Sequence, residues 1–117
     1  MEASYVVRGE VVVVELKGRL NFDVTGPFRR ACMERLVNEK VVFDLRGLSF
    51  VGSLGLKDFV DTLDHMSQNS ATGLKFSGAS SEFRRLFEAS GIPPLSFFDS
   101  TEKAIQSFTP PPLGSLI

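Results

Sequence analysis

The sequence has very few of the residues that build metal sites, disulfides and catalytic centres. It contains one histidine, His65, one cysteine, Cys32, and no tryptophan in 117 residues. A lone cysteine cannot form an internal disulfide, which agrees with a reducing compartment. His65 and Cys32 fall on different expected helices, so no pair has zinc-ligand spacing. We therefore expect no metal and no cofactor, with His65 on a helix surface and Cys32 in the core.

An excess of positive charge and long apolar runs are also absent. The formal net charge is −1, from 13 lysines and arginines against 14 aspartates and glutamates. Direct nucleic-acid binding is not expected without a basic excess to neutralise phosphates. The longest apolar run is four residues, the valines at 11–14, far short of a membrane span. No secretory signal is visible at the N-terminus, so we expect a cytoplasmic protein without a membrane span.

The composition is that of one globular domain. Hydrophobic residues make up 43% and charged residues 23%, and the eleven phenylalanines predict aromatic packing in the core. We assign residues 1–108 to this domain. The segment 109–117, Thr-Pro-Pro-Pro-Leu-Gly-Ser-Leu-Ile, cannot continue a helix and is predicted to be a flexible Pro-rich tail.

The first half of the chain predicts a hairpin, a helix and a buried strand. Strands are expected at 4–8 and 11–17, joined through a type II′ turn at Gly9-Glu10, and a loop is expected at 18–24. Thr25 is the predicted N-cap of a helix with Pro27 in its first turn, whose inner side carries four residues, Phe28, Ala31, Cys32 and Leu36. The run 41–45 is rich in β-branched residues and predicts a buried strand.

The second half alternates helices and short strands. From Leu56 the apolar period becomes helical, and Ser67 to Gly73 is expected to be a loop. A strand at 74–77 precedes a helix capped by Ser80 or Ser81, which turns Phe83, Leu86 and Phe87 inward and stops at Gly91. A strand at 95–98 and a last helix capped by Asp99 follow, with Glu102 completing a capping box.

This order, strand-strand-helix and then strand and helix in alternation, predicts an α/β fold. We expect a mixed, mostly parallel five-stranded sheet with an N-terminal antiparallel hairpin and four helices. The stretch Gly52-Ser53-Leu54-Gly55 joins the buried strand to the second helix and presents one hydroxyl. The simpler interpretation of Ser53 is a helix N-cap, and the functional one is a phosphate acceptor at the positive end of the helix dipole.

Catalysis is not expected at this turn. The pattern resembles a nucleophile elbow, but the first glycine directly precedes the serine, which is the wrong spacing. His65 lies twelve residues later, about 18 Å along a helix, so it cannot act as the base for Ser53. Nor does a glycine-rich phosphate loop occur. A nucleotide or anion bound at the helix terminus is a weaker alternative, which a thermal-shift screen would test.

The stretch 41–56, Val-Val-Phe-Asp-Leu-Arg-Gly-Leu-Ser-Phe-Val-Gly-Ser-Leu-Gly-Leu, resembles the signature of STAS domains, the anti-sigma factor antagonist family. Members read as an apolar strand, Asp-Leu, a short loop and Phe-x-Asp-Ser-Ser/Ala/Thr-Gly-Leu. Gly18 to Asn21 resembles the family's Gly-Glu-Leu-Asp, Phe83 to Ile92 its third helix, and Ser100 to Phe108 its last helix. These four patches cover most of the chain in the family's order.

The resemblance implies a bacterial regulator of transcription that binds an anti-sigma factor, which is also its serine kinase. Phosphorylation of the family's serine breaks that complex, and a phosphatase restores it. The implied phosphorylation candidate is Ser53, which would make this a phosphoprotein. The implied partner-binding residues are Asn21, Phe22, Asp23, Gly52, Ser53, Leu54, Gly55 and Leu56. No catalytic residue is implied.

Two positions depart from the family pattern. Gly52 replaces the acidic residue before the serine, and Asn21 replaces the acidic residue of the first loop, although Asp23 follows two positions later. These departures favour partner binding over phosphorylation. They also support an alternative, a STAS adaptor module without phospho-regulation in a transport, stress-sensing or signalling complex.

Overall fold

A computed structural model describes residues 2–20, 22–50, 53–69, 74–90 and 96–108. Its sheet has five strands in the order β1 (Glu2–Arg8), β2 (Val11–Leu20), β3 (Lys40–Phe50), β4 (Leu74–Ser77) and β5 (Phe97–Phe98). β1 pairs antiparallel with β2, and the other neighbours are parallel. The predicted sheet, with its antiparallel N-terminal hairpin, is confirmed. The hairpin turn has Gly9 at φ +65°, the sign that a type II′ turn requires of its first central residue.

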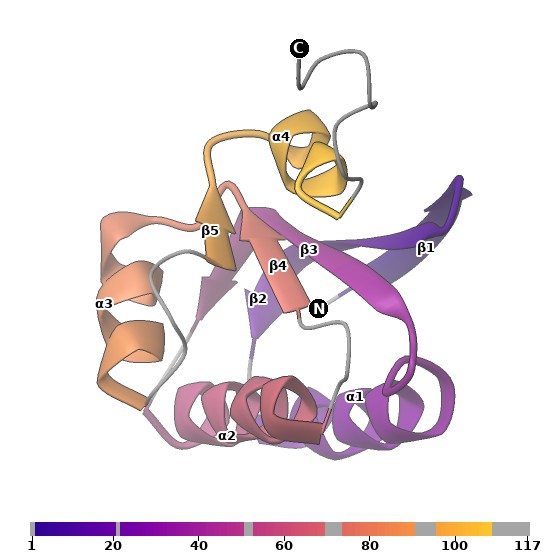
Figure 1. Cartoon of the computed structure of the whole chain (residues 1–117). Coiled ribbons are helices and arrows are strands. Elements are labelled where there is room, and N and C mark those ends of the chain that lie inside the picture. Colours follow the sequence, from indigo (N-terminus) through magenta and orange to yellow (C-terminus); the bar gives the residue numbers. More distant parts are fainter. Residues whose placement is uncertain (1, 21, 51–52, 70–73, 91–95, 109–117) are drawn as a thin grey trace, which may run out of the picture.

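Four helices cover the sheet within the described residues. α1 (Phe22–Arg35), α2 (Ser53–Asn69) and α3 (Ser81–Ser90) lie on one side, and α4 (Thr101–Gln106) lies on the other (Figure 1). Parallel strands joined through helices need cover on both faces, which this layering supplies. β1 extends from the rest of the sheet at one edge, and among the described strands it is paired with β2 alone.

The main core lies between the sheet and helices α1 to α3 and is built on phenylalanine, as the composition predicted. The Phe59 ring of α2 lies 5.3 Å from that of Phe28 and 6.2 Å from that of Phe87, between ring centroids. Phe43 and Phe76 stack across β3 and β4 at 6.0 Å. Tilted and offset rings at such distances gain stabilisation beyond the burial of their area. Cys32 is buried in this core and His65 is exposed, as expected.

The predicted loop at 18–24 is wrong. Gly18, Arg19 and Leu20 continue β2, because β3 runs on to Phe50 and pairs with them after an irregularity between Glu15 and Lys17. Tertiary pairing therefore overrides local turn chemistry. α1 accordingly begins at Phe22, so Thr25 is a buried residue inside the helix rather than its N-cap, and Pro27 lies in the helix interior.

Smaller corrections concern helix ends and faces. α2 runs to Asn69, so Ser67 to Asn69 belong to a helix and not to a loop. Ala31 is exposed, and Leu86 is 37% exposed rather than turned inward. β5 is limited to Phe97 and Phe98 within the described residues, and Leu95 and Gly91 lie outside them.

The serine caps are only partly as predicted. Ser80 caps α3, since its Oγ accepts a hydrogen bond from the Phe83 N–H at 3.2 Å. The predicted Asp99 cap of α4 is wrong: Ser100 is the N-cap and accepts from the Lys103 N–H at 3.2 Å. A serine hydroxyl three residues before the donor satisfies one orphan amide of the first turn.

Candidate functional site

The candidate site is formed where two neighbouring parallel strands end. Leu20 of β2 lies beside Phe50 of β3 in the register of the sheet. α1 begins two residues after Leu20, and α2 begins three residues after Phe50. The carboxyl ends of parallel strands are where open α/β sheets place their binding sites. The fold therefore brings together two segments that lie about thirty residues apart in the chain.

The first turns of α1 and α2 lie side by side at the same level. Phe28 is the seventh residue of α1 and Phe59 the seventh of α2, and their rings are in contact at 5.3 Å. At the same depth, Arg29 Nη1 lies 3.8 Å from Asp58 Oδ1. α1 joins the parallel strands β2 and β3, and α2 joins the parallel strands β3 and β4, so both helices run back along the sheet in the same direction and their N-termini lie at the same end of it.

As far as the structure describes them, the predicted residues belong to the first turns of the two helices. Ser53 is the first residue of α2 and is followed by Leu54, Gly55 and Leu56. Phe22 and Asp23 are the first two residues of α1, and Asp23 is exposed. Asn21 and Gly52 lie outside the described residues. The N-cap role of Ser53 stays a prediction.

The electrostatic setting of the two helix starts differs. The first turn of α2 contains no acidic residue, whereas that of α1 contains Asp23. Lys57, five positions into α2, is exposed. An unneutralised first turn leaves the positive end of the helix dipole available to an anionic group. The start of α2 is therefore the more favourable position of the two for negative charge.

The surface rests on buried packing. Phe59 and Leu63 are fully buried, and the buried Thr62 hydroxyl donates to the Asp58 carbonyl oxygen at 2.9 Å. A core of this kind fixes the axis of α2 and hence the direction of its first turn.

A polar cluster lies on the face of the sheet that α4 covers, and the sequence analysis did not predict it. Asp44 of β3 is 4% exposed and accepts three hydrogen bonds from Arg46: from its backbone N–H at 3.1 Å, Nε at 3.2 Å and Nη2 at 3.0 Å. Burial raises the pKa of Asp44, but these bonds outweigh it and the pKa is lowered overall. Ser77 and Thr101 hydroxyls meet nearby at 2.8 Å, joining β4 to α4. The sequence does contain a signal for this cluster, because Asp44 is a carboxylate inside the apolar run 41–45 and a buried carboxylate needs a partner.

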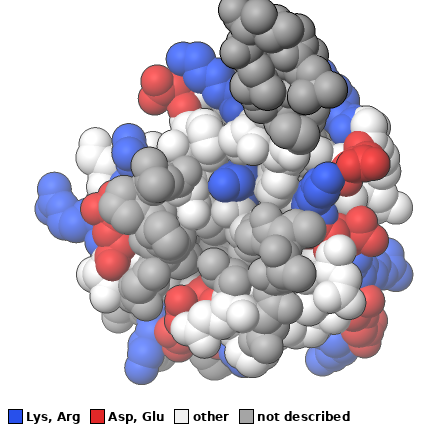
Figure 2. Space-filling model, in the orientation of Figure 1, with Lys and Arg blue, Asp and Glu red and all other residues white. Residues whose placement is uncertain are grey.

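A hollow in the described surface lies away from the two helix starts. It measures about 580 Å³ and lies between β1 and the second half of α1, with Gly9, Leu36 and Glu39 at one end. None of the predicted site residues lines it. On the face drawn in Figure 2, acidic and basic side chains are interspersed, and the coloured residues form no extended patch of one sign.

The described residues show neither a metal cluster nor a membrane helix. No group of three or more His, Cys, Asp or Glu side chains in the described ranges could hold a metal ion. Among the same residues, no helix is both long and apolar enough to cross a bilayer.

Comparison with known proteins identifies the family. The STAS domain model matches residues 2–104, so the chain belongs to the STAS domain family. No curated protein sequence matches it significantly.

Solved structures share the fold. An anti-sigma factor antagonist from Mycobacterium paratuberculosis superposes with a TM-score of 0.70 at 19% identity, covering 93% of this chain and 94% of that one. The Bacillus cell fate determinant SpoIIAA, in its phosphorylated form, gives 0.63 at 21% identity, with 91% and 98% covered. The murine anion transporter Slc26a9 gives 0.63 at 15% identity, and the match covers 85% of this chain but 18% of the transporter.

Proposed function

We propose that this protein is an anti-sigma factor antagonist that docks onto an anti-sigma factor through the paired N-termini of α1 and α2. The docking surface comprises Asn21, Phe22, Asp23 and the segment from Gly52 to Leu56. The position of Ser53 as the first residue of α2, three residues after the end of β3, carries the proposal. That position leaves the serine at the helix start on the signature segment of the family. The protein would act in the cytoplasm of a bacterium as a regulator of transcription, without catalytic activity.

We further propose that Ser53 is the phosphate acceptor of a kinase-type anti-sigma factor and that a phosphatase reverses the modification. A phosphoserine adds close to two negative charges. At the first turn of α2 these charges gain from the helix dipole, because no acidic residue neutralises it. On a docking surface the same charges repel an acidic partner and change its affinity. Antagonists with this fold include one whose phosphorylated form has been solved.

The first experiment mixes the protein with a kinase-type anti-sigma factor and ATP and follows intact mass. We expect one phosphate on the wild type and none on Ser53→Ala. Ser49→Ala is the matched control, since Ser49 is an exposed serine four residues earlier on β3. Loss of phosphate from Ser49→Ala, with Ser53→Ala still modified, would contradict the assignment.

A second experiment separates docking from the switch. Isothermal titration with the anti-sigma factor in the absence of ATP should show binding for Ser53→Ala and at least tenfold weaker binding for Ser53→Asp. Unchanged binding by Ser53→Asp would show that the surface around Ser53 does not contact the anti-sigma factor. Gly52→Asp restores the acidic residue of the family and should raise the phosphorylation rate, if that acid helps to present the serine.

The second candidate is a STAS adaptor without phospho-regulation. Gly52 and Asn21, which stand where the family has acids, favour it. The same fold also occurs as a small part of an anion transporter chain. In this case the wild type would gain no phosphate, and a pulldown would recover transporter or scaffold subunits and no kinase.

A further inference from the structure

The strand β1 is an open edge with an apolar centre. All seven of its residues are exposed, including Tyr5 at 68%, Val6 at 54% and Val7 at 59%. Natural edge strands are protected from pairing by lysine, proline, bulges or short length. β1 contains no lysine or proline, and its register with β2 is uninterrupted over the whole strand. Such an edge is suited to adding another strand.

The outward hydrogen-bonding groups of β1 can be assigned from the hairpin. Arg8 and Val11 flank the two-residue turn, so they form a hydrogen-bonded pair. Backbone groups alternate in direction along an antiparallel strand. The N–H and C=O groups of Ala3, Tyr5 and Val7 therefore point away from β2 toward open solvent.

These three residues are arranged symmetrically around Tyr5. When β1 is placed antiparallel to a second β1 with Tyr5 opposite Tyr5, each Ala3 lies opposite a Val7. All three pairs then have outward groups on both strands, so each pair exchanges two hydrogen bonds. A shift of two residues in either direction reduces the number of such pairs. The register centred on Tyr5 is thus the one that satisfies the most backbone groups.

The charges of the strand follow the same symmetry. Centring on Tyr5 places Glu2 of one copy opposite Arg8 of the other at both ends of the strand pair. Opposite charges directly across neighbouring strands are stabilising. Arg8 is already oriented by Glu102 of α4, with Nη1 2.9 Å from Oε1, and Glu2 of the second copy would add a further carboxylate to this pair. A strand with an acid at one end and a base at the other is complementary to itself in the antiparallel direction.

We propose that β1 pairs with β1 of a second copy of this chain, forming a twofold dimer with a continuous ten-stranded sheet. This self-complementary contact is an isologous interface, as most closed dimers have. The interface uses residues of β1, whereas the proposed docking surface uses the first turns of α1 and α2, so the two surfaces share no residue.

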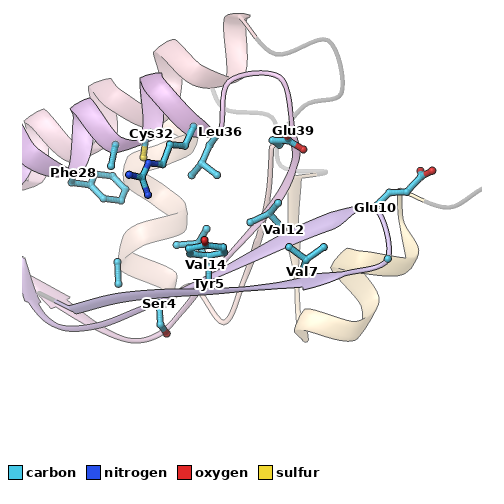
Figure 3. A pocket seen from close by; sticks show the side chains of 14 residues that line it. Ser4, Tyr5, Val7, Glu10, Val12, Val14, Phe28, Cys32, Leu36 and Glu39 are labelled. Carbon is cyan, nitrogen blue, oxygen red and sulfur yellow. The ribbon is translucent and has the colours of Figure 1, made fainter.

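The side chains of β1 give the dimer an apolar contact on the helical face. Tyr5 and Val7 rise from β1 toward α1, whereas Ser4 points to the other side (Figure 3). Together with Val12, Val14 and Leu36 they line the hollow of about 580 Å³ described above. The twofold axis keeps both α1 helices on the same face of the joined sheet. The two hollows would then meet across the central Tyr5 pair, and aromatic cross-strand pairs are among the stronger ones.

The first test measures molar mass by light scattering and sedimentation across protein concentration. The wild type should have twice the monomer mass of 12.9 kDa at high concentration. Tyr5→Lys sets two ammonium groups face to face and should raise the Kd of the dimer at least tenfold. Leu86→Lys, on exposed α3, is the matched control and should leave the Kd unchanged. A monomer mass for the wild type at about 0.5 mM, or an unchanged Kd for Tyr5→Lys, would overturn the proposal.

The second test examines the register by disulfide trapping with Tyr5→Cys. In the proposed dimer the two substituted positions face one another with Cα atoms about 5.5 Å apart, so their thiols are within reach of a disulfide. Val7→Cys is the control, because the two Val7 positions are four residues out of register, about 13 Å apart. The native Cys32 is buried and burial raises its pKa to about 12, so it stays a thiol.

Under oxidised glutathione, Tyr5→Cys should become a covalent dimer in high yield and Val7→Cys should not. Equal or greater cross-linking of Val7→Cys would overturn the register, and so would a Tyr5→Cys chain that stays uncrosslinked. Circular dichroism of each variant confirms that the hairpin and core are intact, because the substituted side chains are exposed.

Discussion

The two faces of the sheet are stabilised in different ways. Among the described residues, the face under α1, α2 and α3 has a cluster of seventeen buried apolar residues, with phenylalanine rings from all three helices and from β3 and β4. The face under α4 has four, namely Val11, Val13, Val42 and Ala104. The α4 face adds polar links to this small cluster: the Asp44–Arg46 pair, the Ser77–Thr101 contact and the Arg8–Glu102 ion pair.

This difference predicts how much stability a substitution on each face should cost. Truncating a large buried apolar side chain costs about 2–5 kcal/mol, whereas a neutral hydrogen bond or an exposed ion pair is worth about 1 kcal/mol and a hydrogen bond to a charged group about 1.5–3 kcal/mol. The candidate docking surface is held by the apolar face, through α1 and α2. Substitutions on the α4 face should therefore reduce stability by smaller amounts and leave that surface in place.

The largest effect is expected for Phe59→Ala. Phe59 is fully buried and contacts the rings of Phe28, Phe83 and Phe87. Its truncation should lower the free energy of unfolding by about 3–5 kcal/mol, as measured by urea denaturation. Leu86→Ala, on the exposed side of α3, should lose much less. A loss below about 1 kcal/mol for Phe59→Ala would contradict the importance of the helical face.

Asp44→Asn tests the polar link on the α4 face. Removing the charge should reduce stability by about 1.5–3 kcal/mol at neutral pH, the usual worth of hydrogen bonds to a charged group. The folded pKa of Asp44 lies below its unfolded value. The ionised side chain therefore stabilises the protein above its unfolded pKa, and this contribution is lost as pH falls through the folded pKa.

Denaturation of wild type and Asp44→Asn at several pH values checks this. The two stabilities should differ most at neutral pH and approach one another in acid. Arg46→Lys keeps the charge but not the two-point contact of the guanidinium, so the stability of this variant at neutral pH should lie between those of the wild type and Asp44→Asn. A difference that does not change with pH would contradict the role of the Asp44 charge.

Gly78→Ala and Gly9→Ala form a matched pair at positive φ. Both glycines have φ near +65°, at +68° and +65°, a conformation that costs a residue with a side chain about 1–2 kcal/mol. A Cβ at Gly78 would also collide with the Arg46 side chain, whereas at Gly9 it would meet open space. Gly78→Ala should therefore be the more destabilising of the two by thermal unfolding. Equal losses would mean that Arg46 moves aside without cost.

The smallest effect is expected at the N-cap of α4. Ser100→Ala removes the hydroxyl that accepts from the Lys103 N–H and should cost about 1 kcal/mol. Asp99→Ala, at the position that the sequence favoured, should change stability by less, because Asp99 only faces Lys103 at 3.9 Å on the surface. A larger loss of stability for Asp99→Ala than for Ser100→Ala in urea denaturation would indicate that Asp99 is the N-cap after all.

The amino-acid sequence by itself determined the class and order of the elements. The valine runs, the helical period after Leu56 and the turn at Gly9-Glu10 predicted the antiparallel hairpin and the parallel strands, which the structure confirms. Phenylalanine content predicted the aromatic core. These features depend on local patterns of burial and turn chemistry, which the sequence displays directly.

The tertiary structure decided the lengths, partners and neighbours. β2 extends through Gly18 because β3 offers it a partner, and this pairing moved the start of α1 from Thr25 to Phe22. Only folding placed the starts of α1 and α2 side by side, joined Asp44 to Arg46 beneath α4, and left β1 as an open edge. The physical reason is that strand pairing and packing act between residues far apart in the chain, whereas sequence patterns report only on neighbours.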